Sequence, residues 1–361
     1  MVSDAIALND FAELTMLALS SEGLIDDALR RKAWPILLHV SPDSMQADSE
    51  TLHTTRERKW GFFLFASSEE KNHYASTLHQ IELDVNRSYS HLQESPVFDH
   101  KRKSLSELLS LFFSRNSDLY YFQGFHDVAA LCQDVLLDSS LSLAVLEKLS
   151  RHYILRDAHR KDFTCTEATL HMIPELVSRT NKEIGVILSL ASPFWAVSMI
   201  ISLFSHDLPS HDAVARIFDV VIVSPPVFPI YLTAALVLTP KVSDALSRLE
   251  NPDTADIHDL LRKAASTNFE SYTNANALVA LAKKLLVQVP PRELLDWSKV
   301  NCKLPRDSIL LNNASTGNYN VAANHLRIRR LTLFASVLAI VFAWVFTFVL
   351  PSSLLNADRM W

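Results

Sequence analysis

Residues 81–87 read IELDVNR, and residues 121–124 read YFQG. In the first segment Asp84 and Arg87 are three residues apart, which places them on one face of a helix. The guanidinium of an arginine is a planar fork of donors that suits phosphate oxygens, and the amide of Gln123 has both a donor and an acceptor with which to orient water. In a chain without a nucleotide-binding loop, these residue types suggest a protein that completes the phosphoryl-transfer site of another protein. Each motif alone has a simpler interpretation, because an Asp–Arg pair at this spacing is most often a solvated salt bridge.

Glycine is scarce in this chain, with only 5 among 361 residues. Average proteins contain roughly 7% glycine, which supplies the turns of β-hairpins and the close backbone approach of phosphate-binding loops. The scarcity argues against a Rossmann or P-loop enzyme and against a turn-rich β-barrel, and it favours an all-α protein. Gly124 is one of the five, so we expect its position to matter to the backbone.

Charge and cysteine usage exclude further classes of protein. Lys and Arg number 34 against 40 Asp and Glu, so nucleic-acid binding by bulk positive charge is not expected. The three cysteines form no C-x-x-C pair, which argues against a zinc ribbon and against a disulfide framework. Three His-Asp dipeptides, at 126–127, 206–207 and 211–212, are not chelating pairs, because adjacent residues of a helix point about 100° apart. We expect these dipeptides at helix ends or on the surface, and we predict no metal site.

Several segments have the composition and spacing of helices. Residues 26–38 carry apolar side chains near 3.6-residue spacing, and Pro35 is expected to kink or end that helix near Trp34, which we assign to the core. Ser104, with Glu107 three residues later, has the pattern of a capping box and is expected to begin another helix. Further helices are expected over 141–151, 166–179 and 255–265.

Residues 331–350 read LTLFASVLAIVFAWVFTFVL, which is 20 residues without a charge. As a helix this segment is about 30 Å long, enough to cross the hydrocarbon core of a bilayer. Arg327, Arg329 and Arg330 stand just before it, which places that flank in the cytosol. We therefore expect one transmembrane helix that anchors the chain by its tail, with the bulk of the chain cytosolic.

Two other apolar stretches, 186–205 and 220–239, are interrupted by prolines or serines and lie beside charged or histidine-rich segments. Core helices of a globular domain explain these stretches better than membrane spans. A multi-pass protein, in which residues 186–239 insert into the membrane, remains an alternative. Residues 304–325 are polar and rich in asparagine, and we expect them to form a flexible linker before the anchor.

The two motifs of the opening stretch, I-x-x-D-x-x-R and, about 35 residues later, Y-x-Q-G, together resemble the paired signature of the TBC domain, the family of Rab GTPase-activating proteins. Residues 29–38, LRRKAWPILL, are similar to the opening L-R-x-x-x-W-x-x-L-L element of that family. Residues 195–238 resemble its third region. The resemblance covers about residues 20 to 290, and it is specific because two separate motifs occur together.

The resemblance implies an all-α TBC (Rab-GAP) domain of two helical lobes. In it Arg87 would be the arginine finger, which stabilises charge on the γ-phosphoryl group of GTP bound to a Rab, and Gln123 would be the glutamine finger, standing in for the water-positioning glutamine of the GTPase. Asp84 would orient Arg87, Tyr121 would support Gln123, and Gly124 completes the second motif. The chain would need no cofactor of its own, because GTP and Mg²⁺ are carried by the Rab.

The expected organisation is an N-terminal helical extension over 1–19, the TBC domain over 20–303, a polar linker over 304–330, the transmembrane helix over 331–350 and a short lumenal tail over 351–361. The implied function is activation of GTP hydrolysis by a Rab of the early secretory pathway, on the membrane of the endoplasmic reticulum or of that pathway. The chain would then be an activator of another enzyme. The alternative is a catalytically silent adaptor of the same fold that binds a Rab or a membrane partner. The presence of both finger residues argues against that alternative.

Overall fold

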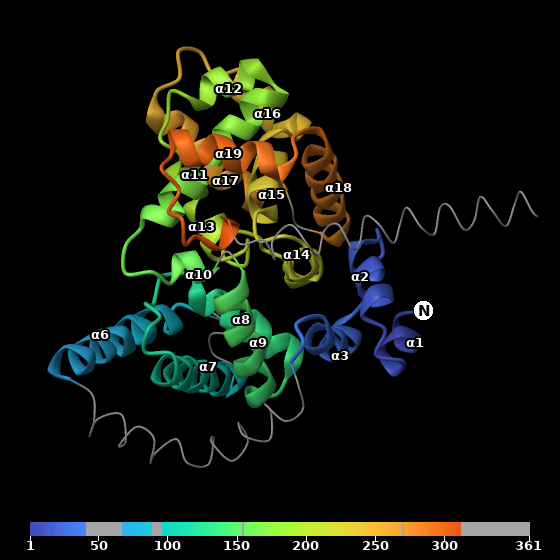
Figure 1. The fold of residues 1–361 in the computed structure, drawn as a ribbon, viewed down its shortest axis with the longest axis vertical. Coiled ribbons are helices and arrows are strands. Elements are labelled where there is room, and N and C mark those ends of the chain that lie inside the picture. The colour runs from blue at the N-terminus through green and yellow to red at the C-terminus, as the bar shows by residue number, and fades with distance from the viewer. Residues whose placement is uncertain (41–66, 89–95, 154, 269–270, 312–361) are drawn as a thin grey trace, which may run out of the picture. The chain divides into compact units, whose positions relative to one another are not determined.

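The computed structural model describes residues 1–40, 67–88, 96–153, 155–268 and 271–311, and every regular element in these ranges is a helix (Figure 1). The all-α prediction is therefore confirmed for this part of the chain. Residues 1–315 form one compact unit, so any division into lobes lies within a single packed body. The expected membrane helix over 331–350 and the tail over 351–361 lie outside the described residues.

The helices of the described residues follow one another along the chain in the order of their labels. Up to residue 158 the structure has α1 (Val2–Ala7), α2 (Phe11–Leu19), α3 (Asp27–Leu37), α6 (Ser68–Val85), α7 (Pro96–Arg115), α8 (Phe125–Leu136), α9 (Ser139–His152) and α10 (Leu155–Ala158). After it come α11 (Thr164–Thr180), α12 (Lys182–Leu188), η2 (Pro193–Ala196), α13 (Val197–Ile201), α14 (His211–Val223), α15 (Phe228–Val237), α16 (Pro240–Ser247), α17 (Thr254–Asn268), α18 (Tyr272–Gln288), α19 (Pro291–Asn301) and η3 (Ile309–Leu311).

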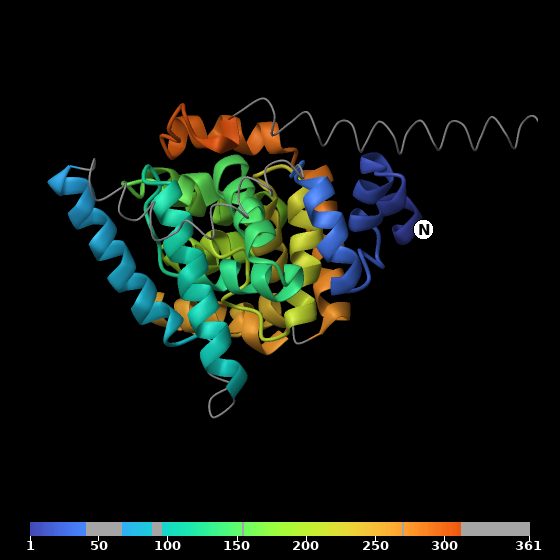
Figure 2. The same cartoon turned by 90° about the horizontal axis from the view of Figure 1, so that it is seen from below.

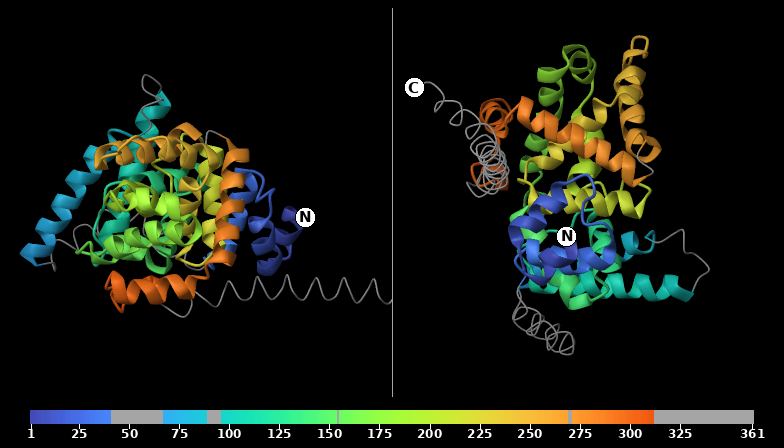
Figure 3. Two further views of the ribbon diagram at one scale, coloured as in Figure 1. Left: turned by 90° about the horizontal axis from the view of Figure 1, so that it is seen from above. Right: turned by 90° about the vertical axis from the view of Figure 1, so that its right-hand side faces the viewer.

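The packing places α8 at the junction between two groups of helices. Helix α6 packs on α7, α7 packs on α8, and α8 contacts α3, α9 and α14. Helix α14 in turn contacts α18, and α15 packs between α11 and α18. Helix α6 lies at one edge of the unit beside α7, while α1–α3 lie at the opposite edge (Figures 2 and 3). Helix α6 also contacts α8 directly.

Two helix boundaries differ from the sequence predictions. Helix α3 is capped by Asp26, whose carboxylate accepts from the Leu29 amide, and it runs past Pro35 to Leu37. Of the two effects expected of Pro35, a kink or an end near Trp34, the end does not occur, because a proline in the last turn removes only one hydrogen bond of the helix. Helix α7 begins at Pro96, so the predicted start at Ser104 is also wrong.

The interior position of Ser104 in α7 has a tertiary explanation. Its hydroxyl accepts a hydrogen bond from the amide of Gln133 on α8. The serine therefore joins two helices instead of capping one. A local capping pattern cannot be distinguished from such a contact by spacing alone.

A buried ion pair joins α3 to α14. Arg30 donates from Nε to Asp219 Oδ1 at 3.1 Å, and Trp34 donates from Nε1 to the same oxygen at 2.9 Å. The side chains of Arg30 and Asp219 are 2% and 0% exposed, and Trp34 is fully buried. The expected core role of Trp34 is confirmed, and the pair links the opening element to the third region of the family resemblance.

The packed fold continues beyond residue 303, where the sequence places the start of the linker. Ser308 donates its hydroxyl proton to Asp157 Oδ2 at 2.6 Å, and the Ile309 amide donates to Oδ1 at 3.1 Å. Ile309 and Leu310 are buried. Residues 304–311 are therefore part of the globular unit, while the rest of the expected linker lies outside the described residues.

Within the described ranges, none of the helices taken singly has both the length and the hydropathy needed to cross a bilayer. One pair, Lys182–Leu188 with Pro193–Ile201, meets both requirements only in combination, and it is bent by 102° at its break. The stretch at 220–239 falls on the last residues of α14 and on α15, whose side chains are buried in the unit.

Candidate functional site

The predicted fingers stand at two helix ends. Arg87 follows α6 in a turn, where its amide donates to the Asp84 carbonyl at 3.0 Å. Gln123 precedes Gly124, the N-cap residue of α8. The side chains of Arg87 and Gln123 are both exposed. The guanidinium of Arg87 makes no ion pair or hydrogen bond with another described residue, so within that part of the chain it is available to a partner.

A short hydrogen bond joins the two motifs. The hydroxyl of Tyr121 donates to Asp84 Oδ2 at 2.7 Å, across 37 positions of sequence. Asp84 is 5% exposed, so this bond lies below the surface that carries the fingers. The expected orientation of Arg87 by the Asp84 carboxylate is not seen, because that carboxylate faces Tyr121 and His126. Asp84 instead acts on Arg87 through its backbone carbonyl.

Gly124 has a backbone conformation that favours glycine. Its φ of 105° lies in the left-handed region, where a side chain is strained. This conformation turns the chain from residues 120–123 into α8 and leaves Gln123 at the surface. The expectation that this glycine matters to the backbone is confirmed.

Hydrogen bonds with His159 hold the segment before Gln123 in place. The amide of Tyr120 donates to the His159 carbonyl, and the His159 ring bonds back to the Tyr120 carbonyl, both at 2.9 Å. The rings of Phe122 and His159 are 4.8 Å apart. Burial lowers the pKa of His159 to about 4, so its ring stays neutral near pH 7. Gln123 is thus presented by a fixed backbone.

His126 is a part of the site that sequence reasoning missed. It is 6% exposed, and its Nδ1 lies 3.3 Å from both the Tyr121 oxygen and the Gly124 amide nitrogen. Burial lowers the pKa of His126 below its ordinary value of 6.5. Of the two placements expected for the His-Asp dipeptides, a helix end or the surface, His126 has the first, since it lies in the first turn of α8 and is buried. Its one sequence signal is its position two residues after Gly124.

Asp127 connects the first turn of α8 to the segment before α14. Its Oδ2 lies 2.8 Å from His206 Nδ1, and its Oδ1 lies 3.4 Å from His126 Nε2. Two of the three His-Asp dipeptides are therefore in contact, which their separation in sequence does not reveal. In the described part of the chain, no group of three or more His, Cys, Asp or Glu side chains is arranged to hold a metal ion.

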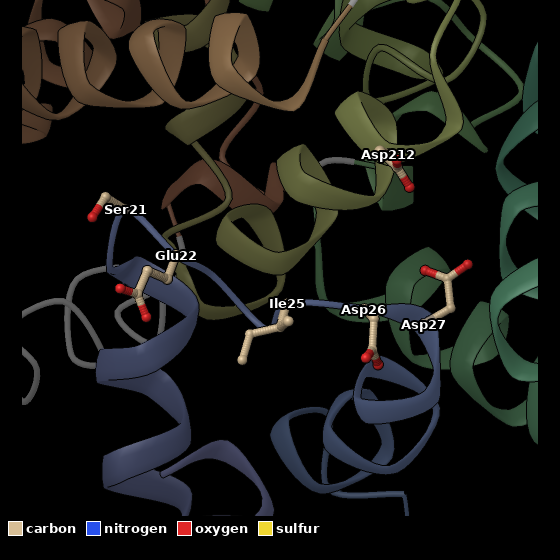
Figure 4. Close-up of a pocket in the computed structure, with 6 residues that line it drawn as sticks. All are labelled: Ser21, Glu22, Ile25, Asp26, Asp27 and Asp212. Atoms are coloured by element: carbon tan, nitrogen blue, oxygen red, sulfur yellow. The ribbon is translucent and has the colours of Figure 1, made fainter.

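A separate cavity of about 760 Å³ lies where the loop before α3 faces the start of α14 (Figure 4). Its lining residues are Ser21, Glu22, Ile25, Asp26, Asp27 and Asp212. Two of these carboxylates have structural partners, because Asp26 caps α3 and Asp27 pairs with Arg30 and His211. None of the residues of the two motifs lines this cavity, so it is not the candidate site.

Replacing Tyr121 with phenylalanine removes the hydroxyl that joins the two motifs. The Asp84 carboxylate would then be buried without its 2.7 Å donor, and we expect the free energy of unfolding to fall by about 1–3 kcal/mol. Urea denaturation of the full chain measures this loss. Tyr120→Phe is the matched control, since its ring is not part of the Asp84 contact; an equal effect of both variants would contradict the assignment.

Comparison with known proteins points to the same family as the two motifs. A family model described as the Rab-GTPase-TBC domain matches residues 27–242. The chain is 27% identical over 292 residues to TBC1 domain family member 20 of Homo sapiens and of Bos taurus, which covers 79% of this chain but only 65% of those relatives. It is 26% identical over 336 residues to GTPase-activating protein gyp10 of Schizosaccharomyces pombe, which covers 91% of this chain and 82% of the relative.

Among solved structures, the fold is similar to that of the Ypt/Rab-GAP domain of Gyp1p, with a TM-score of 0.60. The two are 18% identical, and the match covers 80% of this chain and 99% of the other. At this identity the likeness concerns the fold, which is the all-helical TBC Rab-GAP fold.

Proposed function

Because this chain belongs to the Rab-GTPase-TBC domain family, we propose that it is a GTPase-activating protein that supplies Arg87 and Gln123 to a GTP-bound Rab. The observation that carries the proposal is the hydrogen bond between Tyr121 and Asp84. It fixes two motifs at the ends of different helices against each other, and each motif contains an exposed polar side chain, Arg87 or Gln123, of the type that this chemistry uses.

The proposed mechanism is positioning and electrostatic stabilisation, without a covalent step on this chain. Arg87 would lie against the γ-phosphoryl group and stabilise the charge that develops on it during transfer. Gln123 would hold the attacking water through its amide group. GTP and Mg²⁺ enter with the Rab, as parts of the substrate complex.

The site is suited to this role because hydrogen bonds hold the backbone at Arg87 and before Gln123, while the two side chains are exposed. The amide of Arg87 is held by the Asp84 carbonyl, and the backbone before Gln123 is held by His159. A side chain delivered from a fixed backbone loses less conformational entropy when the Rab binds. The catalytically silent adaptor is less well supported, because such an adaptor has no need of two exposed finger residues on motifs that are hydrogen-bonded to each other.

The proposed location is the membrane of the endoplasmic reticulum or early secretory pathway, with residues 331–350 as a single anchor. Support comes from the sequence alone: a span of 20 uncharged residues with three arginines just before it. Residues 1–315 would then face the cytosol, where GTP-bound Rabs are found. The substrate would be a Rab of that pathway.

The test of the proposal is single-turnover GTP hydrolysis by a panel of purified Rabs, with the full chain added in detergent. We expect stimulation of one or a few Rabs. A Rab that binds the chain but keeps its intrinsic rate of hydrolysis would support the adaptor. If no Rab binds or responds, the proposed function is wrong.

Gln123→Ala should lower the maximal stimulated rate by about 10²-fold, because the attacking water loses its orienting group. The concentration of chain that gives half-maximal stimulation should change little. Gln288→Ala is a matched control, since Gln288 is also an exposed glutamine at a helix end. A Gln123→Ala variant that stimulates as well as Gln288→Ala would remove Gln123 from the mechanism.

A further inference from the structure

A chain of polar contacts runs from the surface to the backbone beside Gln123. His206 Nδ1 lies 2.8 Å from Asp127 Oδ2, and Asp127 Oδ1 lies 3.4 Å from His126 Nε2. On the other side of its ring, His126 Nδ1 accepts from the Gly124 amide at 3.3 Å. His206, Asp127 and His126 thus connect the segment before α14 to the residue that follows Gln123.

The contacts fix the protonation of His126. The Tyr121 hydroxyl has one proton, and its 2.7 Å bond to Asp84 uses it. Because the Gly124 amide donates to His126 Nδ1, that nitrogen carries no proton, and the ring proton is on Nε2, facing Asp127. A neutral His126 therefore accepts from the Gly124 amide and turns its N–H toward Asp127, whose Oδ1 lies 3.4 Å away.

The segment that carries His206 is held in an uncommon backbone conformation. Leu203 and Phe204 have φ of 53° and 69°, in the left-handed region, and both are buried. A Cβ atom added at Gly124 would lie 3.6 Å from the Cβ of Ser202, so this segment packs directly beneath Gly124. The Ser202 hydroxyl accepts from the His206 amide at 3.3 Å. His206 is therefore presented to Asp127 from a defined backbone.

We propose that His206 is a positioning residue, which acts through Asp127 and His126 to hold the Gly124 backbone and thereby aims the Gln123 side chain. The inference rests on the proposed function, because its effect is read through the stimulation of a Rab. His206 touches no reacting group itself. Its contribution is the orientation of the loop before the Rab arrives, which should alter the rate of the bound complex more than the affinity.

The charge of His206 gives this positioning a pH dependence. The hydrogen bond with Asp127 raises the pKa of His206 above its ordinary value of 6.5, and the negative charges of Asp207 and Asp84 act in the same direction. Of the other titratable groups beside it, His126 has a pKa that burial lowers, which favours its neutral form. His206 is therefore charged below its raised pKa, where its ion pair with Asp127 is complete. As the pH rises through that pKa, the charge is lost and the weaker neutral hydrogen bond remains.

The variants are chosen to separate the hydrogen bond from the charge. His206→Ala removes both, while His206→Asn places a neutral donor near the position of Nδ1 and cannot titrate. His211→Ala is the matched control, because His211 bonds Asp27 at 2.7 Å in a pair of similar exposure, 41% and 30%, against 54% and 21% for His206 and Asp127. Asp27 is on α3 and does not contact either motif.

The experiment uses the full chain in detergent and the Rab that it stimulates most, from about pH 6 to about pH 8.5. We expect His206→Ala to lower the maximal stimulated rate by about fivefold near the lower end, the size of effect that a half-exposed pair supports. The half-maximal concentration should be unchanged. His206→Asn should keep most of the activity, and the ratio of wild-type to His206→Asn rates should fall toward one as the pH rises. His211→Ala should behave as wild type.

Two results would overturn the inference. One is an equal effect of His206→Ala and His211→Ala on the stimulated rate, which would make the pair a general surface contact. The other is a ratio of wild-type to His206→Asn rates that stays the same at every pH. Thermal unfolding of each variant shows whether a lost rate reflects a lost fold. If the wild-type chain stimulates no Rab, the proposed function is wrong, and the inference that rests on it is wrong as well.

Discussion

Arg87→Ala is expected to lower the stimulated rate of GTP hydrolysis by about 10³-fold or more, which is the effect of an arginine supplied in trans to a phosphoryl-transfer site. The reason is electrostatic. The guanidinium would lie against oxygens that gain negative charge only in the transition state, so its loss raises the barrier without an equal loss of binding. The maximal rate should therefore collapse, while the variant still competes with wild type for the Rab.

The stability of Arg87→Ala should be close to that of wild type, within about 0.5 kcal/mol, because an exposed side chain with few contacts contributes little to folding. The exposed Arg87 makes no ion pair or hydrogen bond within the described residues. A loss of rate without a loss of stability distinguishes a finger from a structural arginine.

Two further variants complete this test. Arg87→Lys keeps the charge but loses the planar fork, so we expect an intermediate rate. Arg292→Ala is the matched control, since that arginine is 91% exposed on α19. If Arg87→Ala stimulates a Rab as well as Arg292→Ala, Arg87 is not the arginine finger.

The helices were the most predictable part of the fold. The predicted ranges 141–151, 166–179 and 255–265 lie inside α9, α11 and α17, because their apolar residues repeat at the helical period. The start of α7 was not predictable from local pattern, because Ser104 bonds Gln133 on another helix. The end of the globular unit was missed for a similar reason, since the contacts of Ser308 and Ile309 with Asp157 span 151 and 152 positions of sequence.

For the candidate site too, the local motifs could be predicted from the sequence, but the contacts between them could not. The two motifs could be found in sequence because each is a short local pattern. The contact between Asp84 and Tyr121 crosses 37 positions, and the contact between Asp127 and His206 crosses 79. Spacing along the chain contains no information about such pairs without a fold in which to place them. His126 was expected at a helix end or on the surface, but its burial and its contacts with Tyr121 and Gly124 follow only from the packing of α8.

Asp219→Asn is expected to lower the free energy of unfolding by about 3–5 kcal/mol, the usual cost of removing one partner from a buried ion pair. The asparagine retains an oxygen that can accept from Trp34, but it leaves the charge of Arg30 without its main partner in a site from which water is excluded. Asp27 remains within 2.9 Å of Arg30, and it is 30% exposed, so it compensates only in part. Urea denaturation followed by tryptophan fluorescence measures the loss.

The control and the double variant show whether the charge of Arg30 is the cause. Asp118→Asn breaks a surface pair with Arg151, whose side chains are 63% and 42% exposed, and should cost no more than about 1 kcal/mol. Arg30→Met combined with Asp219→Asn removes both charges and should recover part of the stability lost in Asp219→Asn alone, because no unpaired charge is then buried. A double variant that is less stable than Asp219→Asn would mean that Arg30 stabilises the fold through its packing and its contact with Asp27. The contact between α3 and α14 would then not depend on the buried charge pair.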